Sequence, residues 1–338
     1  MDPGDKPIIA IAAGDPAGIG PEISIKAALD AGVHEVCNPI VVSDCAVIER
    51  QARACRIRVD LRKIRSVGEA DWSGAALNVL DCSQPELASL PFGTTSAAGG
   101  RASLAFAAAA VQYAAEGSVD AVVAAPQNEI SIALAGIPFD GYPSFVARET
   151  GTNPDDVYLM LHFDGVKIVH TTLHQSVRQA LVAITRDKVL GAIRAAEAAL
   201  RKLGITKPRI AVGGLNPHAS EGGLFGSEER EVIEPAIETA VAQGITAKGP
   251  FATDTMFHRR GFDAFIVMLH DQGHIAAKLL APNATAALTI GTPILFSSVA
   301  HGSAHDIAGK GRADPAAMIA ALLLLSKARE RIESQPVA

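Results

Sequence analysis

Short apolar runs alternate along this chain with alanine-rich stretches of helical length, and this alternation limits the fold more than any other feature. The apolar runs are "IIAIAAG", "PIVVS", "LNVLD" and "VDAVVAAP" in the first part, and "VKIVHTT", "PRIAVGGLN", "FDAFIVML" and "AALTIG" in the second. Such runs are typical of strands buried on both faces, joined to parallel neighbours by helices. The sequence therefore predicts an α/β fold.

The chain is long enough for two domains of ordinary size. It has 338 residues, 49% of them hydrophobic, which gives each domain material for its own core. The clearest predicted helices span 100–115, 186–203 and 314–327. A glycine- and proline-rich stretch at 136–143 is the predicted crossing between the domains.

The composition argues against several classes of partner. The 36 acidic and 30 basic residues give a net charge of −6 and are mixed along the chain, so nucleic acid is not an expected partner. No apolar run reaches the length of about 18 residues that a membrane span needs. The first residues, "MDPGDKP", lack the form of a signal peptide. We therefore expect a cytoplasmic protein whose cysteines, Cys37, Cys45, Cys55 and Cys82, are reduced core thiols.

The run "FIVMLHDQGHIAAKLL", residues 265–280, is apolar enough for a buried strand, yet it contains a polar group, "HDQGH". Burying such side chains without partners costs several kcal/mol, so we expect them at a strand end, facing a ligand. His174 and His218 also follow predicted strands inside polar turns. Three imidazoles can hold a divalent cation with a position open for substrate. Ordinary hydrogen-bonded histidines are the alternative, and the residues alone leave both interpretations open.

Two glycine-containing segments also follow predicted strands. The glycines of "AAGDPAGIGPEI", residues 12–23, do not form the G-x-G-x-x-G dinucleotide fingerprint, and a tight strand-to-helix turn explains them. The segment "SSVAHGSAHDIAG", residues 297–309, surrounds His301 and His305 with small polar residues. It is predicted to be either a cofactor-binding loop or a helix-capping turn.

Five motifs in this order resemble the 4-hydroxythreonine-4-phosphate dehydrogenase family over nearly the whole chain: "GDPAGIGPE", "LNPHASEGG", "ATDTMF", "HDQGH" and "HGSAHDIAG". The resemblance implies two α/β/α domains around a cleft, similar to isocitrate and isopropylmalate dehydrogenases and not to a Rossmann fold. With it we expect a first domain of residues 1–134 plus 311–338, and a second domain of residues 135–310 that carries the metal ligands and the dimer contacts. It also implies an NAD-dependent homodimer with one divalent metal ion per shared active site.

The resemblance assigns roles to individual residues. The metal ligands are His174, His218 and His270, the last reaching across from the partner subunit. Zinc is the expected ion, with cobalt, nickel, manganese, iron and magnesium as alternatives. The expected catalytic residues are Asp254, Asp271 and Lys278, where Lys278 is either an acid/base group or a carboxylate binder. The expected cofactor-binding residues are His301, Gly302, Ser303 and Asp306.

Several positions depart from the family that makes the vitamin precursor. That family has Gly-His-Thr-Glu after "GIPF", a lysine in "P-x-N-K", an asparagine before the "LTIG"-like strand and an arginine before "SSV". This chain has "DGYPS" after "GIPF", and Glu129 in place of the lysine. Losing such groups removes charge-assisted bonds to a phosphate worth about 1.5–3 kcal/mol each. Ala287 stands in place of the asparagine and Phe296 in place of the arginine. By resemblance, the expected substrate-binding positions are Tyr142, Pro143, Ser144, Ala287 and Phe296.

These departures resemble the branch that contains terephthalate cis-dihydrodiol dehydrogenase. The implied reaction is the NAD-dependent oxidative decarboxylation of 1,2-dihydroxy-3,5-cyclohexadiene-1,4-dicarboxylate to protocatechuate. The alternative is oxidation of 4-phosphohydroxy-threonine or of a related sugar-acid phosphate. A non-catalytic metal- or ligand-binding protein on the same scaffold is a further alternative, which any formation of NADH would exclude.

Overall fold

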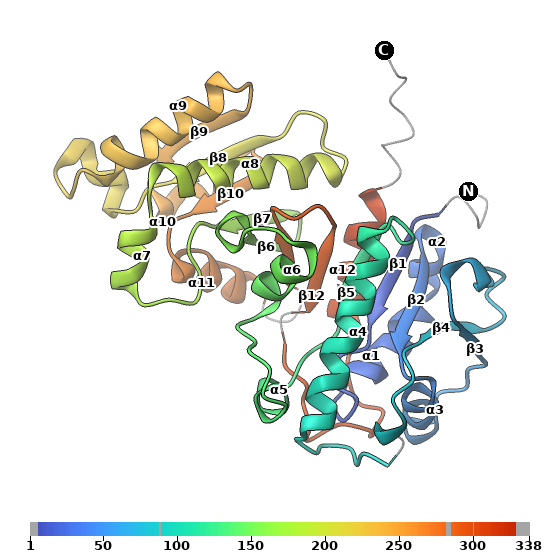
Figure 1. The fold of residues 1–338 in the computed structure, drawn as a ribbon. Coiled ribbons are helices and arrows are strands. Elements are labelled where there is room, and N and C mark those ends of the chain that lie inside the picture. Colours follow the sequence, from blue (N-terminus) through green and yellow to red (C-terminus); the bar gives the residue numbers. More distant parts are fainter. Residues whose placement is uncertain (1–5, 88, 282–284, 300, 329–338) are drawn as a thin grey trace. The chain divides into compact units, whose positions relative to one another are not determined.

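The computed structural model describes residues 6–87, 89–281, 285–299 and 301–328, and it forms two compact units (Figure 1). Unit 1 comprises Met1–Thr150 and Pro293–Ala338, and unit 2 comprises Gly151–Thr292. Each unit contains a sheet and helices that pack on it, which confirms the predicted α/β class.

The boundaries of the units differ from the expected domain boundaries, because residues 135–150 and 293–310 belong to unit 1. Within that unit, helix α6 (Tyr142–Thr150) packs against helix α4 (Ala97–Ala115), and strand β12 (Phe296–Val299) pairs with strand β5 (Ala121–Ala124). Of the expected domains, residues 1–5, 88, 282–284, 300 and 329–338 lie outside the described residues.

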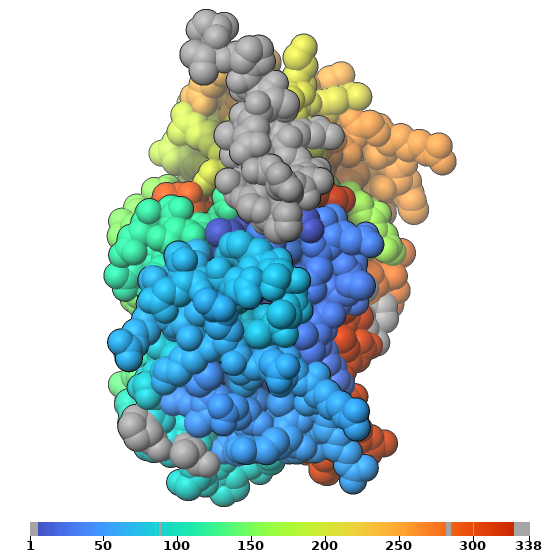
Figure 2. Space-filling model, turned by 90° about the vertical axis from the view of Figure 1, so that its right-hand side faces the viewer, coloured from blue at the N-terminus to red at the C-terminus, as the bar shows by residue number. Residues whose placement is uncertain are grey.

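The sheet of unit 1 is parallel in all its pairings, in the order β3-β4-β2-β1-β5-β12. Its central strands are almost completely buried, as a sheet covered on both faces requires. The edge strand β3 lies among the light blue residues that face the viewer in Figure 2. The remaining strands are β1 (Ile8–Ala12), β2 (Asn38–Ser43), β3 (Leu61–Ile64) and β4 (Leu77–Asp81).

Helix α4, the long teal helix in Figure 1, packs on β1, β2 and β5. Helices α1 and α2 pack on β2, and α12 packs on β5 and β12. Helix α4 begins after Ser96, whose side chain accepts a hydrogen bond from the N–H of Gly99. The other helices are α1 (Gly20–Ala28), α2 (Ala31–Val36), α3 (Cys45–Ala54), α5 (Glu129–Leu134) and α12 (Ala316–Leu325).

The sheet of unit 2 has the order β11-β6-β7-β10-β8-β9, with antiparallel pairing at β11-β6 and β6-β7 and parallel pairing elsewhere. Strands β6 and β7 form a hairpin because Asp164 and Gly165 both adopt positive φ, as a two-residue hairpin turn requires. The strands are β6 (Tyr158–Phe163), β7 (Val166–His170), β8 (Arg209–Gly213), β9 (Thr246–Phe251), β10 (Ala264–Val267) and β11 (Ala286–Ile290).

Helix α8 packs on several strands of this sheet and on helix α9, whereas helix α11 packs on β7 and β10. The long helix α8 carries an apolar face that buries Val189, Ile193 and Leu200. The helices of unit 2 are α7 (Val177–Ala183), α8 (Arg186–Lys202), α9 (Glu234–Ala242), α10 (Thr253–Met256) and α11 (His270–Leu280).

Two expectations from composition can be compared with the structure. Cys37, Cys45, Cys55 and Cys82 are all free; Cys37 and Cys45 are buried, and Cys55 and Cys82 are half-buried. Among the described residues, no helix is both long enough and apolar enough to cross a membrane.

Candidate active site

Helix α11 begins at the polar group inside the apolar run. The side chain Oε1 of Gln272 accepts hydrogen bonds from the backbone N–H groups of Met268 (2.9 Å) and Leu269 (3.0 Å). The first N–H groups of a helix have no acceptor within the helix, and the Gln272 side chain supplies one here. The polar group "HDQGH" therefore forms the start of a helix, whereas we expected it at the end of a strand. His270 is the first residue of α11, and its Nδ1 lies 2.7 Å from Oδ1 of Asp271.

The rings of His174 and His270 lie side by side, with their centroids 5.6 Å apart. Because Nδ1 of His270 donates to Asp271, its Nε2 carries a lone pair, as in the carboxylate–histidine–metal arrangement. The His174 ring is exposed and the His270 side chain is 34% exposed. Both imidazoles are therefore accessible to a divalent ion.

His218 lies on an irregular segment, Pro217–Gly223, in which five successive residues beginning with His218 have φ between 47° and 69°. The buried carboxylate of Glu229 holds the start of this segment. It accepts hydrogen bonds from the N–H groups of Leu215 (2.8 Å) and Asn216 (2.7 Å), and from the side-chain amide of Asn216 (2.9 Å). Left-handed backbone of this kind is costly and is concentrated at ligand sites.

A cavity of about 620 Å³ lies beside this segment in unit 2. Its volume falls within the range of about 300–1,000 Å³ that is usual for small-molecule sites. Apolar side chains of Phe257, Ile275 and Leu279 form part of its wall. Three of the expected site residues, His218, Asp254 and Asp271, line the same cavity.

The three expected metal ligands are not assembled within a single chain. Among the described residues, no three His, Cys, Asp or Glu side chains are placed so that they could hold a metal ion together. The ring contact that His218 makes is with Phe225, at a centroid distance of 6.5 Å. One chain thus supplies the pair His174 and His270, and separately presents His218 on the wall of the cavity.

Two further histidines, His170 and His274, belong to this cluster and were not among the predicted site residues. The His274 ring stacks on His270, and its Nδ1 lies 3.0 Å from Nε2 of His170. Burial is the largest cause that lowers the pKa of His170 to about 3 and the pKa of His274 to about 4. The neighbouring imidazoles add to both shifts, and the exposed Lys278 adds to that of His274. The i,i+4 spacing of His270 and His274 was the signal that could have found this cluster.

In unit 1, two of the expected substrate-binding residues belong to an aromatic cluster. The Tyr142 ring lies 5.0 Å from the Phe296 ring, and its hydroxyl donates to the carbonyl of Ala125 (2.9 Å) and accepts from Nε2 of Gln127 (2.7 Å). Phe296 is 0% exposed and its ring packs against Tyr142, whereas the sequence led us to expect direct contact with substrate. Of the other expected residues, Pro143 and Ser144 are half-buried in α6, and Ala287 is buried in β11 of unit 2.

Within the expected cofactor segment, residues 297–309, the part from residue 301 onward packs on the glycine-rich turn that follows β1. The carbonyl oxygen of Ser303 accepts a hydrogen bond from the N–H of Ile19 (2.9 Å), and a Cβ on Gly18 would lie 2.7 Å from that oxygen. The glycine therefore permits the close approach of two loops. Within the expected cofactor set, Ser303 is buried, and His301, Gly302 and Asp306 are exposed.

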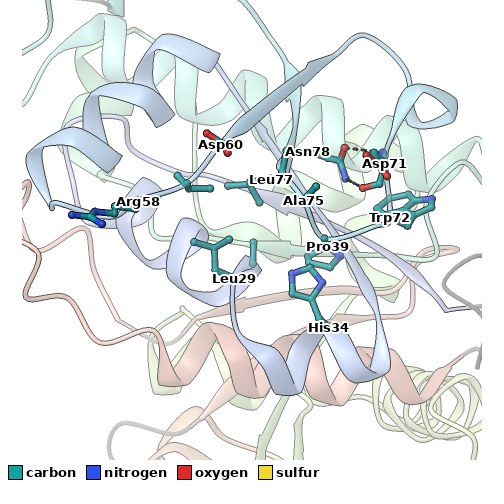
Figure 3. A pocket seen from close by; sticks show the side chains of 14 residues that line it. Leu29, His34, Pro39, Arg58, Asp60, Asp71, Trp72, Ala75, Leu77 and Asn78 are labelled. Carbon is teal, nitrogen blue, oxygen red and sulfur yellow. Dashed lines mark hydrogen bonds between the residues drawn. The ribbon is translucent and has the colours of Figure 1, made fainter.

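A second cavity, of about 320 Å³, lies in unit 1 and contains none of the predicted site residues. Figure 3 shows the side chains of Leu29 and Leu77 between Arg58 on one side and Trp72 on the other. In its wall, the side-chain amide of Asn78 accepts a hydrogen bond from the backbone N–H of Asp71 and donates one to the backbone carbonyl of Asp71. It lies by the first residues of β2 and β4, whereas ligands of open α/β sheets bind beyond the carboxyl ends of the strands.

Comparison with known proteins identifies relatives over nearly the whole chain. Residues 35–325 match the family described as pyridoxal phosphate biosynthetic protein PdxA. The chain is 42% identical to a 1,2-dihydroxy-3,5-cyclohexadiene-1,4-dicarboxylate dehydrogenase of a Comamonas species, over 94% of this chain and 96% of the relative.

Two solved structures resemble the protein closely. A terephthalate 1,2-cis-dihydrodiol dehydrogenase from Burkholderia xenovorans LB400 is 41% identical with a TM-score of 0.73, and 95% of this chain and 98% of that chain are covered. A 4-hydroxythreonine-4-phosphate dehydrogenase from Burkholderia phymatum is 36% identical with a TM-score of 0.87. The match covers 96% of this chain and 98% of that chain. These matches confirm the family and the fold expected from the five motifs: the chain belongs to the PdxA family.

Proposed function

We propose that this dehydrogenase catalyses the NAD-dependent oxidative decarboxylation of a carboxylated cis-dihydrodiol, with 1,2-dihydroxy-3,5-cyclohexadiene-1,4-dicarboxylate as its substrate. The observation that carries the proposal is the aromatic cluster around Tyr142, at positions where the resemblance expects groups that bind phosphate. Phe139, Phe145 and Phe296 pack around the Tyr142 ring. A flat carbocyclic substrate suits an aromatic neighbour such as Tyr142, whereas a phosphate dianion requires cationic donors.

The proposed reaction is balanced without a further oxidant. The C2–H bond breaks and its hydride passes to NAD⁺, while the C2 hydroxyl gives its proton to a base, which leaves a ketone at C2. The carboxylate on C1 then departs as carbon dioxide, and the bonding electron pair remains as an enolate that takes up the proton on oxygen. The ring becomes aromatic, and the products are protocatechuate, carbon dioxide and NADH.

We assign the divalent ion, with zinc as the expected element, to His174, His218 and His270. Such an ion would supply Lewis-acid polarisation of the substrate oxygens. His174 and His270 are both accessible on unit 2, and His218 lies on the wall of the cavity. Because one chain does not bring the three together among its described residues, we assign His270 to the site of a second subunit.

The surface of unit 2 supports a homodimer. Helix α11, which carries His270, exposes Ile275, Leu279 and Leu280, each more than half accessible. Helix α7 likewise exposes three apolar side chains, those of Val177, Leu181 and Val182. Exposed apolar residues gathered on single helices are typical of surfaces that a partner covers. A second copy of the chain would cover this surface and bring His270 to the partner's cavity.

The carboxylates of the cavity are suited to proton transfer. Asp254 and Asp271 line the cavity with His218, and both are exposed to it. We propose that one of them accepts the proton of the C2 hydroxyl. Lys278 lies on the exposed face of α11 and either binds a substrate carboxylate or returns the proton to the enolate.

For the cofactor we propose NAD, held by the loop that contains His301, Gly302, Ser303 and Asp306. A Cβ built on Gly302 meets no atom within 4 Å, so its backbone is open to a ligand. The exposed carboxylate of Asp306 is an acceptor of the kind that binds ribose hydroxyls. A cytoplasmic location is part of this proposal, because four free thiols suit a reducing compartment.

The second candidate function is oxidation of 4-phosphohydroxy-threonine or of a related sugar-acid phosphate, which the likeness to the Burkholderia phymatum enzyme favours. A substrate panel separates the two candidates by NADH absorbance. The purified homodimer is incubated with NAD, a divalent metal and, in turn, the terephthalate diol, other carboxylated cis-diols and 4-phosphohydroxy-threonine. We expect NADH and protocatechuate from the diol. Turnover of the phosphorylated amino acid alone would replace this proposal with the second candidate.

A further inference from the structure

The ring of His274 lies flat against the ring of His270. Their centroids are 3.8 Å apart and their planes differ by 10°. The two residues are four positions apart on α11, so the helix brings both rings to the same side. Each nitrogen lone pair lies in the plane of its ring, and two parallel planes that are separated by a stacking distance do not meet at one ion. His274 is therefore not placed to bind the ion that His270 binds.

His274 is itself held by a chain of hydrogen bonds. Nδ1 of the fully buried His170 lies 3.4 Å from the carbonyl oxygen of Leu159, and a carbonyl can only accept, so His170 donates from Nδ1. Nε2 of His170 then accepts from Nδ1 of His274, at 3.0 Å. The tautomer and the orientation of the His274 ring are thereby fixed from the strands β6 and β7.

The contact between His170 and α11 requires a glycine. A Cβ on Gly273 would lie 2.4 Å from Nε2 of His170 and 2.8 Å from Cγ2 of Ile168. Any larger residue would move α11 away from β7 and break the bond between the two imidazoles. Gly273 and His170 therefore form, together with His274, a built support under the first turn of α11.

We propose that His274 is a positioning residue for the metal site, which keeps the His270 imidazole at the angle that directs its Nε2 to the metal. Asp271 fixes Nδ1 of His270 on one side, and the stacked ring of His274 limits rotation of the His270 side chain. The inference rests on the proposed function, because it takes His270 to be a ligand. Outer residues that orient a metal-binding histidine typically change metal affinity by about 10–100-fold when they are replaced.

Two matched variants separate stacking from hydrogen bonding. His274→Phe keeps a flat ring that can stack but has no nitrogen, and His274→Gln keeps an amide that can bond to His170 but has no ring. The full-length protein is titrated with Co²⁺ against a chelator, and the visible spectrum of the bound ion reports its coordination. We expect His274→Phe to retain affinity within a few-fold and to keep the wild-type spectrum, and His274→Gln to lose about 10-fold or more.

The outcomes distinguish this inference from the proposed function. If the wild-type protein binds no Co²⁺, both the proposed metal site and the positioning role of His274 are wrong. If the wild-type protein binds Co²⁺ and His274→Gln binds it equally well, the positioning role is overturned while the metal site stands. If His274→Phe is as weak as His274→Gln, stacking is not the means of support. Thermal unfolding of each variant shows that it is folded before its affinity is compared.

Discussion

The imidazole Nε2 of His305 lies 2.6 Å from the carboxylate Oδ2 of Asp15 and joins two loops that are 290 residues apart in the chain. Asp15 is 1% exposed, and its other oxygen accepts a hydrogen bond from the N–H of Ala17. The pair thus fixes the expected cofactor segment, residues 297–309, to the turn after β1.

Removing the Asp15 carboxylate should destabilise unit 1. In Asp15→Ala, the His305 ring and the N–H of Ala17 lose their acceptor, and breaking a buried pair of this kind costs about 3 kcal/mol. Denaturant unfolding would measure the shift of the midpoint. Asp187→Ala, which removes an exposed carboxylate from the first turn of α8, is the control and should change stability little. Equal midpoints for the two variants would show that the pair contributes nothing.

The shared site predicts complementation between inactive variants. His174→Ala and His270→Ala should each lose metal and turnover while remaining folded, because each removes one imidazole of the proposed set. A mixed dimer should then regain one intact site, built from His174 and His218 of one subunit and His270 of the other. Activity and bound metal are measured after exchange of tagged subunits has been verified. Verified exchange without recovery would place all the ligands within one chain.

Substrate choice should depend on the Tyr142 ring and not on direct contact with Phe296. Phe296→Arg would bury a charge beside the Tyr142 ring, so its effect would mix folding with recognition. Tyr142→Ala removes the ring and should lower kcat/KM for the carboxylated diol about tenfold or more, equivalent to about 1.4 kcal/mol. Tyr142→Phe keeps the ring and is the control, with a smaller loss expected. A Tyr142→Ala enzyme with wild-type kcat/KM would remove Tyr142 from the substrate site.

The cysteines should react slowly with iodoacetamide at neutral pH. Burial is the largest cause that raises the pKa of Cys37 to about 12 and the pKa values of Cys45, Cys55 and Cys82 to about 11. The thiolate is the reactive form, so the folded protein offers little of it. Mass spectrometry should find native protein nearly unmodified under conditions in which unfolded protein is labelled at all four thiols. Rapid labelling of the native protein would contradict this burial.

The same pKa values predict how stability depends on pH. Below the ordinary thiol pKa of 9.0, the folded and unfolded chains both keep these protons. Between 9.0 and about 11, the unfolded chain ionises first, so the free energy of unfolding falls as the pH rises. Replacing Cys82 by serine should reduce this loss at alkaline pH, as unfolding midpoints at several pH values would show.

The sequence predicted the elements whose pattern is local. The apolar runs became buried strands, and the predicted helices at 100–115, 186–203 and 314–327 correspond to α4, α8 and α12. The histidine-bearing turns were found because polar groups inside apolar runs are rare enough to be noticed. His174 and His270 accordingly lie together in the structure.

Contacts between distant segments could not be predicted in the same way. No local pattern links Asp15 to His305, or His170 to His274, because each pair meets only once the strands are ordered in the sheet. The burial of Phe296 involves its ring contact with Tyr142 of α6, and the boundaries of the units depend on which strand β12 joins. The chain order of the elements does not specify such pairings.

Strand β12, which completes the sheet of unit 1 beside β5, is encoded after the whole of unit 2. The ribosome therefore synthesises all of unit 2 before it synthesises β12 and the helix α12, which packs on β12 and completes unit 1. During synthesis, the edge of β5 that pairs with β12 stays unpaired until more than a hundred further residues have been made. Unit 2 therefore has the opportunity to fold before unit 1 is complete. The insertion of one unit into the other thus sets the order in which a newly made chain can become complete.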